Sequence, residues 1–343
     1  MTTEGMDLDR HPVARSTDVA DTVPVIDIAA LTGSGPRHRG AARSAAIDAV
    51  AAACRDWGFF QVVNHGVPPA LIDGVWRETR RFFALAAPAK QAVLRSRGNP
   101  WGYYNNELTK NQRDRKEVFD FTSDGVDPIY GSTNRWPEGL PGFRAAMDGY
   151  LEACARLSLT LLGAFCAGLG LSPRCLHARF RRHTGFVRLN HYPVRDPLAD
   201  ADLPRLPAAD MGVHNHTDAG VLTVLLQDEV GGLQVYRDGE WHGVRPRPDA
   251  FVVNTGDMMQ VWSNDEYRAA IHRVTAMRDR DRYSIPFFYN PSADTRVEPF
   301  AALLGDGRRP RYRAIPWAEF RSLRTDGDYA DYGDEVQIAR YRS

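Results

Sequence analysis

The sequence of 343 residues has little lysine, little cysteine and no excess charge of either sign. Lysine occurs only at positions 90, 110 and 116, so arginine carries nearly all of the positive charge, and the formal net charge is zero. Without a basic block, the chain lacks the usual signature of a protein that binds nucleic acid or an anionic membrane surface. The arginine and alanine content is typical of GC-rich coding and favours a bacterial source.

The cysteines show no pattern that would indicate a metal site or a disulfide framework. None of them forms a CxxC pair or a zinc-finger spacing. Three lie among apolar residues in helix-like segments, so we expect ordinary buried thiols. The four are Cys54, Cys154, Cys166 and Cys175.

The sequence also lacks a recognisable targeting or membrane segment. The first 22 residues are polar and contain no apolar signal core. No stretch approaches the length of a membrane span. We therefore expect a cytoplasmic protein. Since nothing strongly basic stands out, its expected partner is a small molecule, and the expected state is a monomer or a weak homo-oligomer.

The length exceeds the size at which one hydrophobic core stops growing, so we expect a catalytic unit with a substantial extension. Composition and periodicity divide the chain into five segments. They are a flexible leader (1–22), an N-terminal module (23–140), scaffold helices (141–182), a catalytic core (183–293), and a C-terminal tail with a helix that is a candidate lid (294–343).

The segment from 221 to 262 is typical of a β-rich unit. Short β-prone runs are separated by glycine, proline and aspartate, which predicts an antiparallel meander that closes into a barrel or a double-sheet roll. The expected fold class is mainly β with helices (α+β). The runs are Val221–Leu226, Leu233–Tyr236, Trp241–Val244, Phe251–Asn254 and Met258–Trp262.

Helices are expected outside this core. Apolar residues recur at helical spacing in 41–57 and 69–85, and the longest helical pattern covers 141–171. We expect this last helix to lie against the outside of the roll. A final amphipathic helix is expected at 317–323.

The strongest chemical signal is the pair His216 and Asp218 with the distant His272. Residues at i and i+2 of an extended chain point to the same side, so His216 and Asp218 can grip one ion. Two imidazoles and one carboxylate leave half of an octahedron open, as in non-haem Fe(II) oxygenases. The sequence therefore predicts a site for iron and O₂.

A lone histidine is more often structural, and we interpret His65 in this way, as a turn residue.

A second signal follows ten residues after His272. Arg282 and Ser284 share one strand face and offer a fork of donors with a hydroxyl group, which suits a carboxylate. The alternative is a surface arginine, and the apolar run 285–289 that follows argues against it.

The strand 186–193 indicates a polar cavity inside the roll. Alternation places Arg188, Asn190 and Tyr192 on one face, while the other face is mostly apolar. Such buried polar groups need partners, which a polar ligand would supply. Tyr103, Tyr104 and Asn106 lie in the irregular stretch 98–115, and we expect this loop to line a substrate pocket.

The segment 214–291 resembles the catalytic core of the 2-oxoglutarate and Fe(II)-dependent dioxygenases, in the branch similar to isopenicillin N synthase. The resemblance rests on motifs in the same order, including His216-Thr217-Asp218-Ala219-Gly220, Gly231-Gly232-Leu233-Gln234-Val235, Val253-Asn254-Thr255-Gly256-Asp257, His272-Arg273-Val274 and Arg282-Tyr283-Ser284. The stretch 58–68 is similar to the N-terminal module of that family. A double-stranded β-helix (jelly roll) is implied.

The resemblance also implies roles for single residues. His216, Asp218 and His272 are implied as iron ligands, Arg282 and Ser284 as the holders of the far carboxylate of 2-oxoglutarate, and Asn190 and Tyr192 as further contacts of this co-substrate. We add Phe119, His214 and Phe288 as candidate substrate contacts. His214 forms a second H-x-H pair with His216, but the family pattern uses the histidine two residues before the aspartate.

The expected reaction is the oxidation, most simply the hydroxylation, of a small organic molecule in bacterial secondary metabolism. Fe(II), 2-oxoglutarate and O₂ are the implied cofactors, with ascorbate as a stimulant and with succinate and CO₂ as products. Desaturation and ring closure stay open. Two alternatives remain, a co-substrate-independent oxidase that uses Gln337 on the metal, as isopenicillin-forming relatives use a glutamine, and a non-catalytic roll that binds a small molecule.

Overall fold

The structure is a computed structural model that describes residues 23–33, 39–196, 198, 211–305, 307–327 and 336–343. The predicted leader, residues 1–22, lies outside the described residues. So does most of the acidic, tyrosine-rich stretch 326–334 near the C-terminus.

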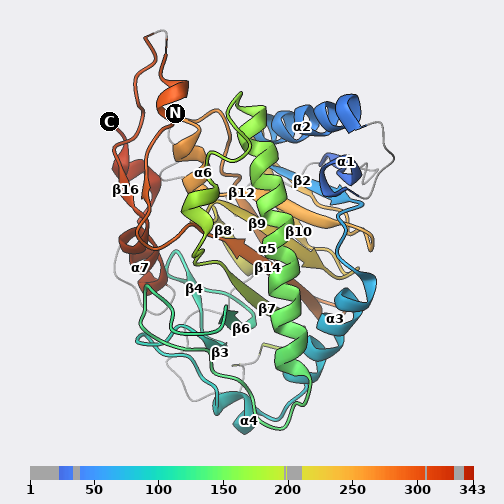
Figure 1. Cartoon of the computed structure of the whole chain (residues 1–343). Coiled ribbons are helices and arrows are strands. Elements are labelled where there is room, and N and C mark those ends of the chain that lie inside the picture. Colours follow the sequence, from blue (N-terminus) through green and yellow to red (C-terminus); the bar gives the residue numbers. More distant parts are fainter. Residues whose placement is uncertain (1–22, 34–38, 197, 199–210, 306, 328–335) are drawn as a thin grey trace.

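Two β-sheets form the centre of the molecule (Figure 1). The larger sheet has the order β1-β2-β12-β9-β14-β7-β6-β3, and all but the β1–β2 pair are antiparallel. Its strands are β1 (Val25–Asp27), β2 (Phe59–Val63), β3 (Gly102–Tyr104), β6 (Glu117–Thr122), β7 (Phe186–Tyr192), β9 (Leu222–Gln227), β12 (Phe251–Thr255) and β14 (Arg282–Tyr289).

The smaller sheet has the order β11-β10-β13-β8 and consists of β8 (Met211–His216), β10 (Leu233–Arg237), β11 (Glu240–Gly243) and β13 (His272–Thr275). Buried apolar side chains of both sheets form one cluster, which includes Val213, Leu225 and Val274. The two sheets therefore face each other across a shared core, as the predicted double-sheet roll requires.

The connections correct the predicted meander. Between β7 and β14, only β10 and β11 are both consecutive in the chain and hydrogen-bonded neighbours. The chain otherwise moves repeatedly from one sheet to the other, which is the pattern of a jelly roll.

One predicted strand is a helix. The run Met258–Trp262 lies in α6 (Asp257–Trp262). The backbone N–H groups of Asp257 and Met258 donate to the carbonyl oxygens of Asp218 at 2.8 Å and Gly220 at 2.9 Å. The chain therefore forms a helical turn that is bonded to the loop after His216, and a short, mostly apolar run alone cannot distinguish such a turn from a buried strand.

Helices cover the outer face of the larger sheet, as predicted. The longest, α5 (Phe143–Gly168), runs across it beside α2 (Arg39–Asp56) and α3 (Pro69–Phe83) (Figure 1). The Tyr150 hydroxyl group donates to the carbonyl oxygen of Ile285 in β14 at 3.1 Å, which joins the helix to the sheet.

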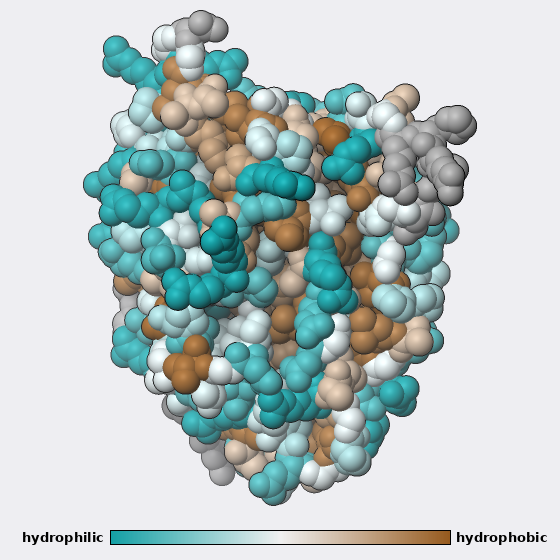
Figure 2. Space-filling view, viewed as in Figure 1, coloured by the Kyte–Doolittle hydropathy of each residue, from teal (hydrophilic) through white to brown (hydrophobic). Residues whose placement is uncertain are grey.

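By length and composition α5 could cross a membrane, contrary to the expectation that no stretch approaches this length. However, 56% of its most apolar window is buried. Its outer side carries charged residues such as Glu152 and Arg156, and hydrophilic side chains lie among apolar ones on this face of the molecule (Figure 2). The apolar character of α5 is thus explained by the sheet on which it packs.

The remaining described elements are short or lie near the C-terminus. They are α1 (Ala29–Thr32), α4 (Ala87–Gln91), the hairpin β4 (Leu108–Thr109) and β5 (Gln112–Arg113), the 3₁₀ helices His177–Phe180, Ala301–Leu303 and Ile338–Tyr341, the pair β15 (Arg296–Val297) and β16 (Ile315–Pro316), and α7 (Trp317–Gly327).

Gly58 allows the chain to pass from α2 into β2. Its φ is +62°, and a Cβ atom there would lie 2.3 Å from the carbonyl oxygen of Arg268. Gly33 has a similar φ of +84° but open space around it.

We expect Gly33→Ala to lower the free energy of unfolding by about 1 kcal/mol, and Gly58→Ala by more than about 3 kcal/mol, because only the latter adds a backbone clash. Urea denaturation measures both, and equal effects would contradict the close approach.

Candidate active site

His216, Asp218 and His272 meet where β8 and β13 lie side by side. His272 is opposite His216 in the register of the two strands, and Asp218 follows β8 by two residues. The Nε2 atoms of His216 and of His272 each lie 3.7 Å from Oδ1 of Asp218. The ligand atoms of all three residues lie within 4.8 Å of one another, so the group could hold one metal ion.

Hydrogen bonds fix the orientation of both imidazoles. Nδ1 of His216 donates to the carbonyl oxygen of His214 at 2.8 Å, and Nδ1 of His272 donates to that of Ala270 at 3.0 Å. A carbonyl oxygen only accepts, so Nδ1 carries the proton and the lone pair remains on Nε2. Both Nε2 atoms are therefore prepared to bind a metal.

Asp218 is oriented in the same way. Its Oδ2 accepts hydrogen bonds from Oγ1 of Thr223 at 2.5 Å and Nδ2 of Asn254 at 2.7 Å, which leaves Oδ1 facing the two histidines. Burial would raise the pKa of Asp218, but the two imidazoles and these hydrogen bonds lower it below its usual value. Burial and the neighbouring His272 lower the pKa of His216 to about 3. The group thus combines a carboxylate with a neutral imidazole at His216, as metal binding requires.

A second polar site lies on a buried face of the larger sheet. Arg282 on β14 is fully buried, and its Nε and Nη1 atoms have no hydrogen-bond partner. Nη2 reaches Oε1 of Gln227 only at 3.4 Å, and the guanidinium carbon lies 4.8 Å from the ring of Tyr192. A buried guanidinium group with two idle donor atoms is costly unless an anion completes it.

The neighbours of Arg282 repeat this pattern. Ser284 lies opposite both Asn190 and Gln227 in the strand register, and Nδ2 of Asn190 donates to the Ser284 hydroxyl oxygen at 3.3 Å. Oδ1 of Asn190 and Nε2 of Gln227 are buried without partners. The predicted residues Arg282, Ser284, Asn190 and Tyr192 are therefore brought together. The unused N–H donors of Arg282 and Gln227 fit a small carboxylate ligand.

A cavity of about 110 Å³ opens beside the metal-ligand candidates. His216, Asp218 and the residues between and after them form one wall. Apolar and aromatic side chains form another, and they include Leu108, Phe186, Val213, Phe288 and Trp317. The cavity therefore combines an apolar wall with polar and charged residues next to His216 and Asp218, which suits an organic substrate.

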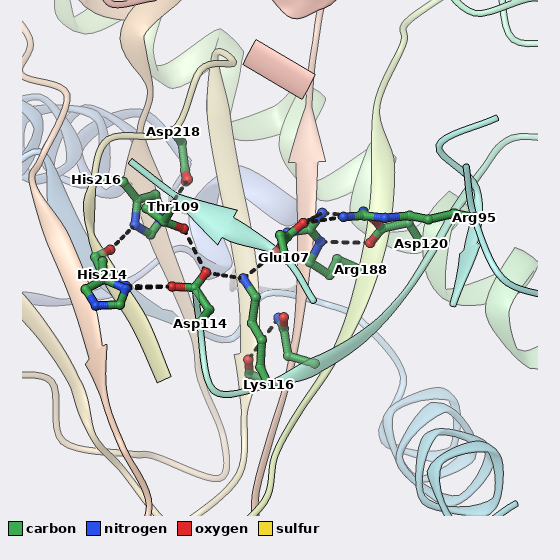
Figure 3. A network of polar contacts seen from close by, with 12 residues as sticks. Arg95, Glu107, Thr109, Asp114, Lys116, Asp120, Arg188, His214, His216 and Asp218 are labelled. Carbon is green, nitrogen blue, oxygen red and sulfur yellow. Dashed lines mark hydrogen bonds and ion pairs between the residues drawn. The ribbon is translucent and has the colours of Figure 1, made fainter. Parts of the chain in front are cut away.

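A buried network of charges underlies this cavity (Figure 3). Glu107 binds Arg95 at 2.7 Å, Lys116 at 2.6 Å and Arg188 at 2.8 Å. Asp120 accepts from Arg95 and Arg188, and Asp114 from Lys116. Three carboxylates thus balance three cations.

The network is ionised although it is buried. Burial would raise the pKa of Glu107, but the charges of Arg188, Lys116 and Arg95 hold it well below its usual value. Burial would lower the pKa of Lys116, but Glu107 and Asp114 raise it. Each charge is therefore stable only because its partners are present.

The network also reaches the metal-ligand candidates. Oδ1 of Asp114 lies 2.9 Å from Nδ1 of His214 and accepts the backbone N–H of His214 at 3.1 Å. The carbonyl oxygen of His214 in turn receives the Nδ1 proton of His216 (Figure 3). His214 therefore connects the buried charges with His216.

Two segments from outside the sheets contribute to the cavity wall. In the hairpin β4–β5, Leu108 and Thr109 line the cavity, and Lys110 donates to Oδ1 of Asn215 at 2.8 Å. In α7, Nη2 of Arg324 donates to the carbonyl oxygen of Thr217 at 2.9 Å. Both segments are thus attached to the strand end that carries the metal-ligand candidates.

Of the six predicted substrate contacts, only Phe288 lines this cavity. Tyr103 lies opposite Phe119 on β3 and β6, and both rings contact Phe82 of α3. They occupy the sheet face that packs on the helices, which corrects their predicted place in the pocket.

The other three predicted contacts also lie outside the cavity wall. The ring of Tyr104 packs against the guanidinium group of Arg95 at 4.6 Å, and His214 binds Asp114. Asn106 lies half-buried between β3 and β4. Gln337, the candidate extra ligand, is not among the residues that line the cavity.

Of the network residues, only Arg188 was expected from the sequence as a buried polar group, and its partners prove to be Glu107 and Asp120. The other network residues and the arginines of α7 were not expected. The available signal was the density of charge in 107–120, where Glu107, Asp114, Lys116, Glu117 and Asp120 interrupt β-prone residues. Their pairing with Arg95 and Arg188 depends on strands far apart in the chain.

Loss of one network charge should destabilise the fold. We expect Glu107→Gln to lower the free energy of unfolding by about 3 to 5 kcal/mol at neutral pH, because it leaves buried cations uncompensated. Since the folded-state pKa of Glu107 is lowered, its stabilising effect is present above the unfolded value of about 4.3 and is lost as the pH falls. The difference between wild type and variant in urea denaturation should therefore shrink in acid. Glu229→Gln, at a surface ion pair with Arg280, serves as the control and should change little. Equal effects of the two substitutions would contradict the account.

Comparisons with known proteins cover nearly the whole chain. A family model described as the 2OG-Fe(II) oxygenase superfamily matches residues 184–291, and one described as non-haem dioxygenase in morphine synthesis N-terminal matches residues 23–139. These ranges contain the strands that carry the candidate ligands and two of the covering helices, α2 and α3.

Individual relatives agree with the family models. Protein DMR6-LIKE OXYGENASE 2 of Arabidopsis thaliana is 33% identical over 314 residues, covering 91% of this chain and 86% of the relative. Naringenin,2-oxoglutarate 3-dioxygenase of Hordeum vulgare is 36% identical over 305 residues, covering 88% of this chain and 76% of the relative. A crystal structure of JOX2 in complex with 2OG, Fe and JA superposes with a TM-score of 0.77 at 30% identity, covering 94% of this chain and 89% of that one.

Proposed function

The chain belongs to the 2OG-Fe(II) oxygenase superfamily, and from this premise we propose that it hydroxylates a small organic molecule bound beside His216 and Asp218. Members of the family use Fe(II), 2-oxoglutarate and O₂. The observation that carries the assignment of the site is the pairing of a three-ligand metal group with a buried, uncompensated arginine. A cluster of metal-binding side chains and a buried arginine without an anion do not stabilise a fold. The cluster fits the iron, and the arginine fits a carboxylate of 2-oxoglutarate.

His216, Asp218 and His272 are the residues that would hold the iron. Their Nε2 and Oδ1 atoms already converge, while hydrogen bonds to Nδ1 and Oδ2 prevent the side chains from turning away. This support keeps the ligand set in place at little conformational cost on binding.

Arg282 and Ser284 would bind the far carboxylate of 2-oxoglutarate. The unpaired Nε and Nη1 donors of Arg282 and the unpaired Nε2 of Gln227 would supply the hydrogen bonds, and the ring of Tyr192 packs against the guanidinium group. Asn190 orients the Ser284 hydroxyl group. These residues therefore fix the co-substrate through groups that otherwise lack partners.

When bound, iron and 2-oxoglutarate supply the oxidant, so that substrate, 2-oxoglutarate and O₂ become hydroxylated substrate, succinate and CO₂. The protein itself orients the substrate and excludes water. Phe186, Phe288 and Trp317 provide the apolar wall, and the hairpin β4–β5 and α7 contribute further residues to the cavity wall. The site thus directs the oxidant to one part of the substrate.

The substrate itself does not follow from the relatives. Their names refer to a flavonoid 7-O-demethylase, a flavanone 3-dioxygenase and a gibberellin 2-beta-dioxygenase, among others. Hydroxylation is the simplest outcome, and desaturation or ring closure would use the same site. A role in bacterial secondary metabolism, a cytoplasmic location, a monomeric or weakly associated state, and the stimulation by ascorbate remain predictions.

Succinate formation tests the proposed function. The anaerobically Fe(II)-loaded protein should form succinate slowly from 2-oxoglutarate once O₂ is admitted, and faster with one class among a library of small organic molecules. Omission of Fe(II) should abolish both rates. If iron binds and no succinate forms under any condition, the enzyme is a co-substrate-independent oxidase or the roll only binds small molecules.

Asp218→Ala should abolish iron-dependent turnover and leave the protein folded, because it removes the charged ligand from a cavity wall. Iron content after gel filtration and succinate formation measure the effect, and circular dichroism checks the fold. Asp294→Ala replaces an exposed carboxylate and is the control. Retained turnover in Asp218→Ala would refute the proposed ligand group.

Arg282→Ala should weaken 2-oxoglutarate binding by about 2 to 5 kcal/mol, because the carboxylate loses its buried charged partner. Calorimetric titration of the Fe(II)-loaded protein without O₂ measures this. Arg280→Ala, two residues earlier and exposed, should bind 2-oxoglutarate like the wild type. An unchanged affinity in Arg282→Ala would place the co-substrate elsewhere.

A further inference from the structure

Arg321 on α7 contributes a positive charge to the cavity that no described carboxylate balances. Its guanidinium group lies 4.8 Å from the ring of Phe186, and Nη1 donates to Oγ1 of Thr325 at 2.5 Å. Within the described ranges it forms no ion pair, and it is half-buried rather than fully solvated. Most N–H donors of its fork are therefore available to a ligand.

The other charges of the cavity wall are already accounted for. Lys116, Arg188 and Glu107 belong to the buried network in which three cations meet three carboxylates. Asp218 faces the two histidines of the proposed metal group. Arg324, the remaining charged residue of the wall, donates to the carbonyl oxygens of Val336 at 3.2 Å and Thr217 at 2.9 Å. Among the described residues Arg321 differs from these neighbours, because it has no carboxylate partner and its fork donates only to Thr325.

The helix holds Arg321 toward the cavity. Trp317, Arg321 and Arg324 follow one another at helical spacing, and all three line the cavity. The indole Nε1 of Trp317 donates to Oγ1 of Thr184 at 2.8 Å, and Nη2 of Arg324 donates to the carbonyl oxygen of Thr217 at 2.9 Å. Arg321 lies between these two attachments, so its position is set by the fold.

The surroundings of Arg321 define the rest of the ligand. Phe186 stacks on Phe288 with ring centroids 4.6 Å apart, and both line the cavity with Trp317. Thr217 and Asp218 line the same cavity, so a molecule that extends from Arg321 along these rings shares one chamber with the metal-ligand candidates. Such a molecule combines an anionic end with an apolar body.

We propose that Arg321 binds a carboxylate group of the substrate, so that the enzyme oxidises small apolar carboxylic acids. This inference rests on the proposed function and narrows its substrate class. Arg321 positions the substrate through the acid group, while a carbon atom of the apolar body faces the metal group. A guanidinium fork suits a carboxylate because it donates two parallel hydrogen bonds.

The test compares acids with their uncharged analogues. Phenylacetate, phenylpropionate and cyclohexylacetate are titrated, each beside its primary amide, into the Fe(II)- and 2-oxoglutarate-loaded protein without O₂, and calorimetry gives the dissociation constants. Wild type should bind at least one acid about tenfold more tightly than its amide. This preference should disappear in Arg321→Gln and persist in Arg156→Gln, a control at an exposed position of α5.

Two measurements keep the outcomes distinct. A higher concentration of 2-oxoglutarate should leave the affinity for the acid unchanged, because a probe that competes with the co-substrate would occupy the Arg282 site. Thermal unfolding should show that Arg321→Gln is folded. A loss of the preference at unchanged 2-oxoglutarate affinity then reports on Arg321 alone.

The proposal is overturned if wild type binds no acid more tightly than its amide, if Arg321→Gln keeps the preference, or if 2-oxoglutarate displaces the acid. The same wild-type preparation is assayed for Fe(II)-dependent succinate formation. Absence of succinate contradicts the proposed function, whereas succinate formation without a preference for acids contradicts only the role of Arg321.

Discussion

The pairing of β8 with β13 is the constraint on which the rest of the site depends. It places His272 opposite His216, although 56 positions separate them in the chain. Asp218 joins them because the chain leaves β8 in an extended conformation, and the turn into α6 supports the following loop through hydrogen bonds to Asp218 and Gly220. A slip of one residue in this register would turn the imidazoles to opposite faces and dissolve the ligand group.

Buried polar groups in this protein fall into two kinds. The network around Glu107, Lys116 and Arg188 is complete, so it stiffens the cavity wall without a ligand. Arg282 and Arg321 have N–H donors without partners among the described residues. We infer that the co-substrate supplies the anion for Arg282 and that the substrate supplies the anion for Arg321. The same physical rule thus distinguishes structural charge from ligand-binding charge.

Local patterns in the sequence predicted those features that depend on local geometry. Alternation placed His216 with Asp218 and Arg282 with Ser284, and helical periodicity found α3 and α5. His272 was a candidate from its residue type alone, and the family resemblance implied its role as a ligand, because no local pattern can bring so distant a residue to the pair. The β-prone runs predicted the double-sheet roll, whereas the jelly roll and 2-oxoglutarate followed from the resemblance, and the relatives confirm the family.

The sequence did not show which face of an element turns toward the cavity. Tyr103 and Phe119 fit a pocket by composition, yet the pairing of β3 with β6 turns both toward α3. The composition of Met258–Trp262 is compatible with a strand, but the segment is helical, because its start is hydrogen-bonded to the loop at Asp218 and Gly220. Glu107 and Arg321 acquire their significance only through partners, present or missing, on distant elements.

The central claim is that one iron ion and one 2-oxoglutarate molecule bind at the two prepared sites. The most direct measurement is a crystal structure of the protein soaked anaerobically with Fe(II) and 2-oxoglutarate, with anomalous scattering recorded at the iron edge. The account predicts an iron peak in contact with Nε2 of His216, Oδ1 of Asp218 and Nε2 of His272, and a carboxylate of 2-oxoglutarate on Arg282. An iron peak elsewhere, or 2-oxoglutarate bound without Arg282, would contradict it.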